Sequence, residues 1–166
     1  VVTARGARGF NLQVRPSDAG YAGEDYSGIF VFDNGSNTLA VGDLVVMSSA
    51  TVANFFGQRQ LQNASGVTVL SSGQALAPAI AVTPADVATG GARAAQLEGT
   101  IVTVVDVAVT DLAPPLGSGD VAPANEFVVG GALRINDFLY LTTPYPALGQ
   151  GYDAITGVLA FRNGNS

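Results

Sequence analysis

Short runs of β-branched and aromatic residues, interrupted at fairly regular intervals by Gly, Asn, Asp and Pro, constrain the fold of this chain more than any other feature. This pattern is typical of an all-β sandwich or barrel, in which each run forms a strand and each interruption a turn. The predicted strands are Val1–Ala4, Gly9–Val14, Gly28–Asp33, Asp43–Ala53, Gln58–Gln62, Val67–Leu70, Gly99–Asp111, Glu126–Val129, Leu139–Leu141 and Tyr152–Phe161.

One segment departs from the strand pattern. Residues Pro84–Ala95 (PADVATGGARAA) are predicted to be helical, because Thr83 suits an N-cap and Pro84 suits the first helical position. The Gly90-Gly91 pair within the segment should end this helix early.

Two glycine-containing segments predict hairpin turns. RGARG (5–9) and DNGSN (33–37) both lie between predicted strands. Their glycines can adopt positive φ, and Asn-Gly favours a tight hairpin. The simplest interpretation of the first segment is a hairpin tip with solvated arginines, and the functional interpretation is a contact with phosphate groups.

The length of 166 residues suits one domain or two small ones. Residues 71–98 are rich in Ala, Pro and Gly, and a stretch of this length is most simply a connector between two structural halves. We therefore expect a first barrel over residues 1–75, a connector over 76–97 and a second barrel half over 98–166. Residues 113–125 are expected to form a second long loop.

The chain has no Lys, His, Cys or Trp, and this absence excludes several classes of chemistry. A tetrahedral zinc site, a Ser-His-Asp or Cys-His relay and a Schiff-base lysine all require residues that are missing. Asp106 and Asp111 are an odd number of positions apart, so on a regular strand they would point to opposite faces. We expect no catalytic residues and no enzymatic activity.

Charge is sparse and unevenly distributed. Charged residues make up 12% of the chain, against about 25% in ordinary soluble domains. The first 17 residues carry three arginines and no acid, whereas the remainder carries four arginines against thirteen acidic residues, which gives the net charge of −6. Any contact with a nucleic acid is therefore expected to be local.

The order of several β motifs resembles the OB-fold-like region of secreted bacterial nucleases, which precedes an endonuclease/exonuclease/phosphatase-type catalytic domain. The motifs are VVTA, GFNLQ, SGIFVFDNG, GDLVVMSSATVANFFGQRQL, VTVLSSG, LEGTIVTVVDVAVTD and INDFLYLTTPYPALGQGYDAITGVLAFRNGNS. The resemblance implies two tandem small barrels of OB type in an exported, multidomain protein. It does not extend to the catalytic chemistry, because that domain uses His and this chain has none.

OB barrels bind single strands with aromatic residues that stack on bases, next to basic side chains that contact the backbone. We predict that such residues cluster at one end of the first barrel. The candidates for contact with DNA are Arg5, Arg8, Phe10, Arg15, Tyr21, Phe56 and Arg59. Three carboxylates in the following loop, those of Asp18, Glu24 and Asp25, are a weaker candidate for a calcium site.

Self-association is the alternative to nucleic-acid binding. Low charge and strands that begin and end at the limits of the sequence suit a subunit of an extracellular filament or surface layer, completed by strand exchange. The aromatic residues Phe138, Tyr140, Tyr145 and Tyr152 would form the interface or close the core of the second barrel. The composition favours an exported protein, and no apolar run is long enough to predict a membrane span.

Overall fold

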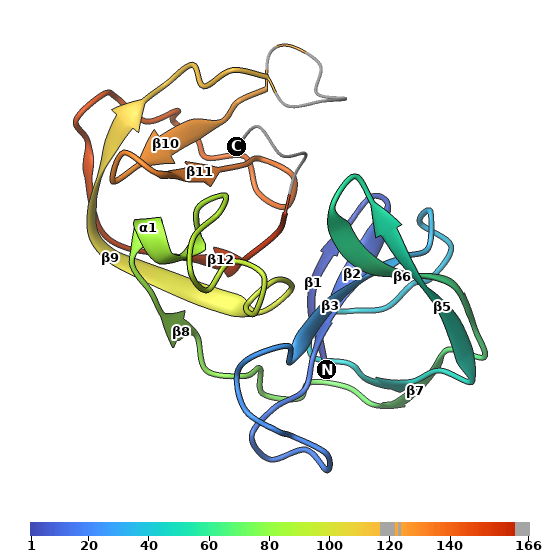
Figure 1. Cartoon of the computed structure of the whole chain (residues 1–166). Coiled ribbons are helices and arrows are strands. Elements are labelled where there is room, and N and C mark those ends of the chain that lie inside the picture. The colour runs from blue at the N-terminus through green and yellow to red at the C-terminus, as the bar shows by residue number, and fades with distance from the viewer. Residues whose placement is uncertain (117–121, 123, 162–166) are drawn as a thin grey trace.

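The computed structural model describes residues 1–116, 122 and 124–161. This described part of the chain is all-β apart from one short helix, as the sequence predicts (Figure 1). The first half contains β1 (Val2–Gly6), β2 (Gly9–Gln13), β3 (Gly28–Phe32), β4 (Leu44–Val46), β5 (Ser49–Phe55), β6 (Gln58–Ser65) and β7 (Thr68–Ser71). The second half contains β8 (Ile80–Ala81), α1 (Pro84–Val87), β9 (Ile101–Asp111), β10 (Phe127–Val129), β11 (Leu133–Ile135) and β12 (Gly151–Val158).

The main sheet of the first half has the strand order β1-β2-β3-β6-β5. Strands β3 and β6 are parallel, and the other neighbours in this sheet are antiparallel. A separate two-stranded sheet pairs β4 with β7. Val2 exchanges backbone hydrogen bonds of 2.9 Å with Gly42 and Asp43, which places the segment before β4 next to β1.

Alternation along β2 determines which side chains enter the first core. Phe10 and Leu12 point inward, and they pack with Val2, Val31 and Leu39. Successive side chains of a strand point to opposite faces, so Asn11 and Gln13 lie on the outer face of the sheet. That outer face is also covered, because Asn11 and Gln13 are 7% and 3% exposed.

The sheet of the second half has the order β11-β10-β9-β12, and β8 pairs with β9 in parallel. The described strands do not form a closed barrel, so the second OB-type barrel that the sequence predicts is not observed. The second half contains two adjoining apolar clusters, one around Leu97 and Val102 and the other around Val104 and Phe127. No helix among the described residues has the length and apolar character needed to cross a bilayer.

Several local predictions are confirmed and others are wrong. Thr83 caps α1 as expected, with a capping box to Asp86, but the helix ends at Val87. The DNGSN turn forms at residues 33–37, yet β3 and β4 do not pair across it. Residues Leu139–Leu141 form a loop and not the predicted strand.

The predicted connector is largely structured. Within it, β8 pairs with β9, and Ile80, Val87 and Leu97 are buried in one cluster with Val102. The second half of the structure therefore begins near Ile80.

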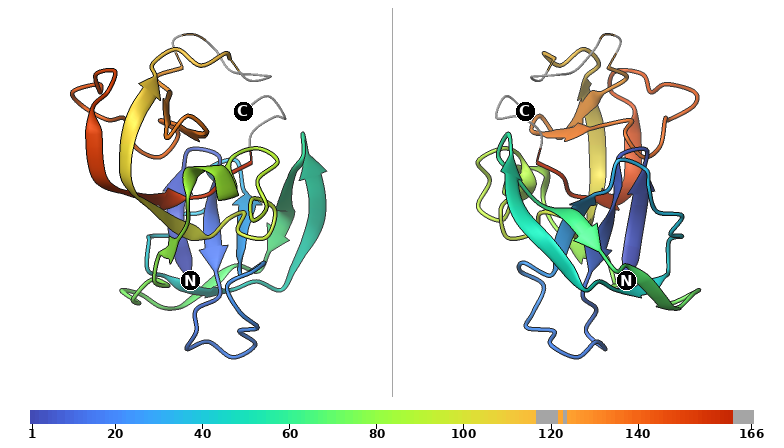
Figure 2. Two further views of the ribbon diagram at one scale, coloured as in Figure 1. Left: turned by 60° about the vertical axis from the view of Figure 1, so that its left-hand side comes forward. Right: turned by 90° about the vertical axis from the view of Figure 1, so that its right-hand side faces the viewer.

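The two halves pack through close backbone contacts. A β carbon on Gly28 would lie 2.5 Å from the backbone nitrogen of Thr100 and closer still to the carbonyl of Gly99. The amide of Ile101 donates a 3.1 Å hydrogen bond to Oε1 of Gln13, and the amide of Tyr26 donates one of 2.6 Å to the carbonyl of Gln96. Segment 96–101 therefore lies against Gln13 at the end of β2 and Gly28 at the start of β3 (Figure 2).

Candidate binding face at the hairpin tips

The β1–β2 and β5–β6 hairpins both turn at the end of the first half that lies towards the second half (Figures 1 and 2). Five of the seven predicted nucleic-acid residues belong to these hairpins, and four of them have side chains outside the first core: Arg5, Arg8, Phe56 and Arg59. Phe55, which the sequence analysis did not select, lies beside them. We call these four residues and Phe55 the tip face.

Local geometry exposes both phenylalanines of the β5–β6 turn. Phe56 and Gly57 have φ values of 49° and 96°, and the amide of Gly57 donates to Oδ1 of Asn54 at 2.8 Å. Phe55 and Phe56 are 53% and 64% exposed, and their rings meet edge to face with centroids 4.7 Å apart. A pair of flat, solvent-facing rings can stack on a planar ligand.

The β1–β2 tip is held by the neighbouring DNGSN turn. The amides of Asp33 and Asn34 each donate a 3.1 Å hydrogen bond to the carbonyl of Arg8. Arg5 pairs with Phe10 in the β1–β2 register, and its Nη1 is buried with no hydrogen-bond partner among the described residues. A buried donor without a partner is costly, so this contact destabilises the tip.

Three predicted residues are not part of the tip face. Phe10 is 0% exposed in the first core, so the prediction that it stacks on bases is wrong. Arg15 and Tyr21 belong to the loop between β2 and β3, which lies at the end of the first half opposite the tips (Figure 1). The predicted cluster of seven therefore divides into four residues near the tips, one in the core and two at the far end.

Arg15 and Asp18 form an ion pair that anchors the loop after β2. Nη2 of Arg15 lies 2.7 Å from Oδ1 of Asp18, and its Nη1 donates to the carbonyl of Ala75 at 3.0 Å. The side-chain hydrogen bonds from Arg15 hold the pKa of the Asp18 carboxyl below its ordinary value. This arginine already has a counter-ion and fixes the chain at Ala75, just before the predicted connector, to the loop.

The three carboxylates predicted to share a calcium ion do not come together. Asp18 pairs with Arg15, whereas Asp25 and Glu24 lie 2.8 and 3.5 Å from Nη2 of Arg93. Within residues 1–116, 122 and 124–161, no group of three acidic side chains is arranged to hold a metal ion.

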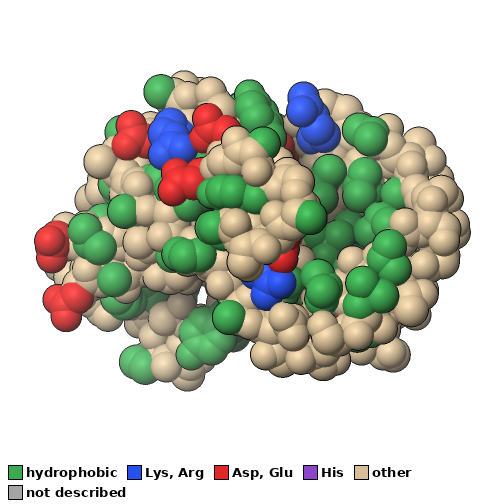
Figure 3. All heavy atoms as spheres, turned by 90° about the horizontal axis from the view of Figure 1, so that it is seen from below, with side chains coloured by type: hydrophobic (Ala, Val, Ile, Leu, Met, Phe, Trp, Pro, Cys, Tyr) green, Lys and Arg blue, Asp and Glu red, His purple; other side chains and the backbone are tan. Residues whose placement is uncertain are grey.

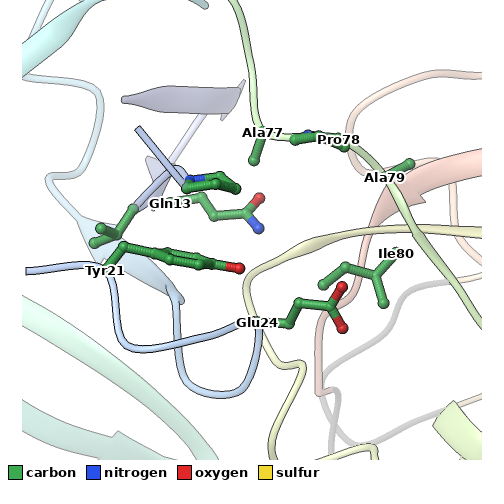
Figure 4. Close-up of a pocket in the computed structure, with 9 residues that line it drawn as sticks. Gln13, Tyr21, Glu24, Ala77, Pro78, Ala79 and Ile80 are labelled. Carbon is green, nitrogen blue, oxygen red and sulfur yellow. The ribbon is translucent and has the colours of Figure 1, made fainter. Parts of the chain in front are cut away.

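Tyr21 and Glu24 line a small cleft at the far end, together with Gln13, Ala77 and Ile80 (Figure 4). The Tyr21 ring and the Glu24 carboxylate extend into the same space from the loop after β2. The amide of Gln13 is already engaged, because its Nε2 donates to Ser27 and its Oε1 accepts from Ile101. The cleft therefore belongs to the packing between the two halves.

Charged side chains elsewhere occur mostly in small groups of both signs. On the face shown in Figure 3, most of the surface is uncharged, and basic groups lie beside acidic ones. Arg15, Arg93 and Arg134 each have an acidic partner within 3 Å. By contrast, Arg5, Arg8 and Arg59 form no ion pair within 4 Å in the part of the chain that the structure describes, although the charge of Arg59 interacts with the nearby carboxyl of Glu98.

Glu98 lies beside the tip face at the junction of the halves. Burial raises the pKa of its carboxyl, and the backbone amide of Arg59 donates a hydrogen bond that opposes this rise. Its Oε1 is buried and has no partner in the described structure. Ionised Glu98 therefore destabilises the junction.

We predict that Glu98→Gln raises the midpoint of thermal unfolding at pH 7 by a few degrees, because a neutral amide costs less to bury than a carboxylate. The raised pKa means that the penalty is complete at high pH and disappears as the pH falls through the folded-state pKa towards the ordinary value of 4.5. The difference between the variant and the parent protein should therefore shrink on acidification. Calorimetry between pH 7 and pH 4 measures it, and a less stable variant at pH 7 would contradict the prediction.

No protein-family model, curated protein or solved structure matches this chain.

Proposed function

We propose that this chain is a non-catalytic accessory module of an exported bacterial protein, and that its tip face contacts extracellular nucleic acid beside a nuclease domain. The observation that carries the proposal is the exposed Arg8 at one hairpin turn and the exposed Arg59, Phe55 and Phe56 at the other, in a chain whose net charge is −6. Phosphate oxygens are acceptors of the required sign and geometry.

The strand order supports an OB-type barrel for the first half. This class is a five-stranded, partly open Greek-key barrel, and its ligands contact the face of strands 2 and 3 together with the first and fourth connecting loops. The sheet β1-β2-β3-β6-β5 has five strands, and the connections corresponding to those two loops are the β1–β2 and β5–β6 turns. These two turns carry the tip face.

The sheet face itself is closed to a ligand in this structure. Asn11, Gln13 and Gln60 are 7%, 3% and 2% exposed, and segment 96–101 lies against β2 and β3. Binding is therefore restricted to the two turns, which limits the number of phosphate contacts. We expect modest affinity that weakens as the salt concentration rises.

The test is a fluorescence anisotropy titration with a labelled oligonucleotide at two salt concentrations. The double variant Arg5→Gln, Arg8→Gln should weaken binding by about 10-fold or more, because two charge-assisted contacts are lost. Arg93→Gln removes one positive charge that is already paired with Asp25, and it should leave the affinity nearly unchanged. Equal affinities for the double variant and the parent protein would exclude the tip face as the site.

Self-assembly is the second candidate function, and β12 favours it. This eight-residue strand pairs with β9 on one side, lies at the edge of its sheet and carries a single charged residue, Asp153. A long edge strand with little charge can recruit another chain. Sedimentation velocity of the same purified protein separates the two functions: a monomer that binds the oligonucleotide supports the first, and concentration-dependent assembly without binding supports the second.

A further inference from the structure

An aromatic side chain of the second half lies directly on the β1–β2 tip. A β carbon on Gly6 would lie 2.6 Å from Cε1 of Phe138, so the Phe138 ring occupies the space that a side chain at position 6 would fill. The amide of Phe138 donates a 2.6 Å hydrogen bond to Oδ1 of Asn136, which fixes the start of this loop. The second half therefore adjoins the tip face at Arg5 and Arg8.

Phe138 begins a run of four exposed apolar residues. Phe138, Leu139, Tyr140 and Leu141 are 45%, 43%, 73% and 50% exposed, and none of them belongs to a described core cluster. We call residues 138–141 the aromatic ledge. A contiguous exposed apolar run beside polar residues is a feature of interaction surfaces.

Other aromatic residues of the second half have structural roles that the aromatic ledge lacks. The ring of Tyr145 packs edge to face on Phe127, and its hydroxyl donates a 2.6 Å hydrogen bond to the carbonyl of Glu126. Tyr152 stacks on Phe127, with ring centroids 6.4 Å apart, and packs against the same cluster. Packing in the core therefore explains why these two positions are tyrosines. It does not explain the tyrosine at position 140, which is 73% exposed.

Charge identifies the occupant of this surface. The aromatic ledge adjoins the end of the first half where arginines without recorded ion pairs gather, while the rest of the chain is acidic. A second copy of the chain carries the same arginines as well as the net charge of −6, so it complements this surface less well than a purely anionic ligand does. A ligand with both flat apolar groups and negative charge matches the aromatic residues and the arginines together.

We propose that the aromatic ledge extends the tip face across both halves and that the combined surface takes single-stranded nucleic acid, with a base stacked on Tyr140. This inference rests on the proposed function and specifies the ligand class. Bases in a duplex are stacked on one another, whereas the bases of a single strand are available to aromatic side chains. Phosphates of the same strand reach Arg5 and Arg8.

The experiment compares labelled single-stranded and duplex DNA of about 15 nucleotides, a length within the range of single-strand sites on barrels of this class. The parent protein should bind the single strand about 10-fold more tightly than the duplex. Tyr140→Ala should weaken single-strand binding by about 10-fold, the effect of losing one base–aromatic stack, with little effect on the duplex. Tyr26→Ala is the matched control, because Tyr26 is 65% exposed and belongs to the loop between β2 and β3, which lies at the end of the first half opposite the tips (Figure 1).

Tyrosine emission provides an independent measurement, because the chain has no tryptophan and only five tyrosines. Single-stranded DNA should quench this emission in the parent protein and in Tyr26→Ala, and it should quench Tyr140→Ala less. Thermal unfolding of the variants verifies that they are folded.

The outcomes separate this inference from the proposed function. The first outcome is equal affinity for both DNA forms, where the affinity falls in the Arg5 and Arg8 double variant but not in Tyr140→Ala. It overturns the role of the aromatic ledge and preserves the proposed function. Absence of binding to either DNA form overturns both. Concentration-dependent dimerisation that is abolished by Tyr140→Ala assigns the ledge to a second copy and also overturns the inference.

Discussion

Gly28→Ala is expected to lower the free energy of unfolding by about 2 to 3 kcal/mol, because it inserts a methyl group between two backbone segments. The new β carbon would lie 2.5 Å from the nitrogen of Thr100 and even closer to the carbonyl group of Gly99. The amide of Gly99 donates a 2.8 Å hydrogen bond to the carbonyl of Leu159, which resists a shift of this residue. The two halves must separate locally, with loss of the Gln13 to Ile101 hydrogen bond.

Urea denaturation measures this effect, and Gly151→Ala is the matched control. A β carbon on Gly151 would have no heavy atom within 4 Å outside its chain neighbours, so the same chemical change in β12 should leave stability within about 0.5 kcal/mol of the parent value. Hydrogen exchange of β2 amides should increase only in Gly28→Ala. Equal stability of the two variants would show that the contact between the halves is loose.

Arg134→Met is expected to destabilise the second half by about 3 kcal/mol, because it leaves the buried carboxylate of Glu126 without a counter-ion. Nη1 of Arg134 lies 2.9 Å from Oε2 of Glu126, and the two side chains are only 14% and 3% exposed. The side-chain amide of Asn136 also donates to Glu126, but a neutral donor does not replace the lost charge. Urea denaturation with the same protocol measures the change.

Two further variants test the cause of that loss. Arg93→Met removes an arginine whose pair with Asp25 is 37% and 53% exposed, and it should cost at most about 0.5 kcal/mol. The double variant Glu126→Gln, Arg134→Met removes the buried charge as well and should recover part of the stability. If Arg134→Met costs no more than Arg93→Met, solvent screens the Glu126 pair despite its burial.

The sequence predicts the existence of most strands and the β1–β2 hairpin because those features are local. Runs of β-branched residues and glycine-containing turns determine them at short range, and β2, β3 and β9 lie within a few residues of their predicted limits. Strand β11 was missed although Gly130 and Gly131, with φ values of 59° and 70°, mark a turn before it. Residues Leu139–Leu141 have strand-like composition but no partner strand among the described residues, so composition alone gave a wrong prediction there.

The candidate site was only partly predictable. The alternation of Phe10 and Leu12 with Asn11 and Gln13 already indicates that Phe10 points into the core. Arg15 lies five residues beyond Phe10, and at about 3.3 Å per residue an extended strand carries it well away from the tip. The proximity of Phe138 to Gly6 links positions far apart in the chain, and no local pattern in a single sequence reveals it.

The backbone contact at Gly28 and Gly99 has a consequence for how this architecture can vary. Side chains normally fill the boundary between neighbouring folding units. The sequence of either unit can then change, or the unit can be replaced, while the boundary side chains repack. Here backbone atoms of the two halves are in direct contact. The amide of Ile101 also donates its hydrogen bond to the side chain of Gln13, 88 positions earlier in the chain. Substitutions in one half must therefore remain compatible with the backbone conformation of the other. We expect the two halves to evolve together as one unit.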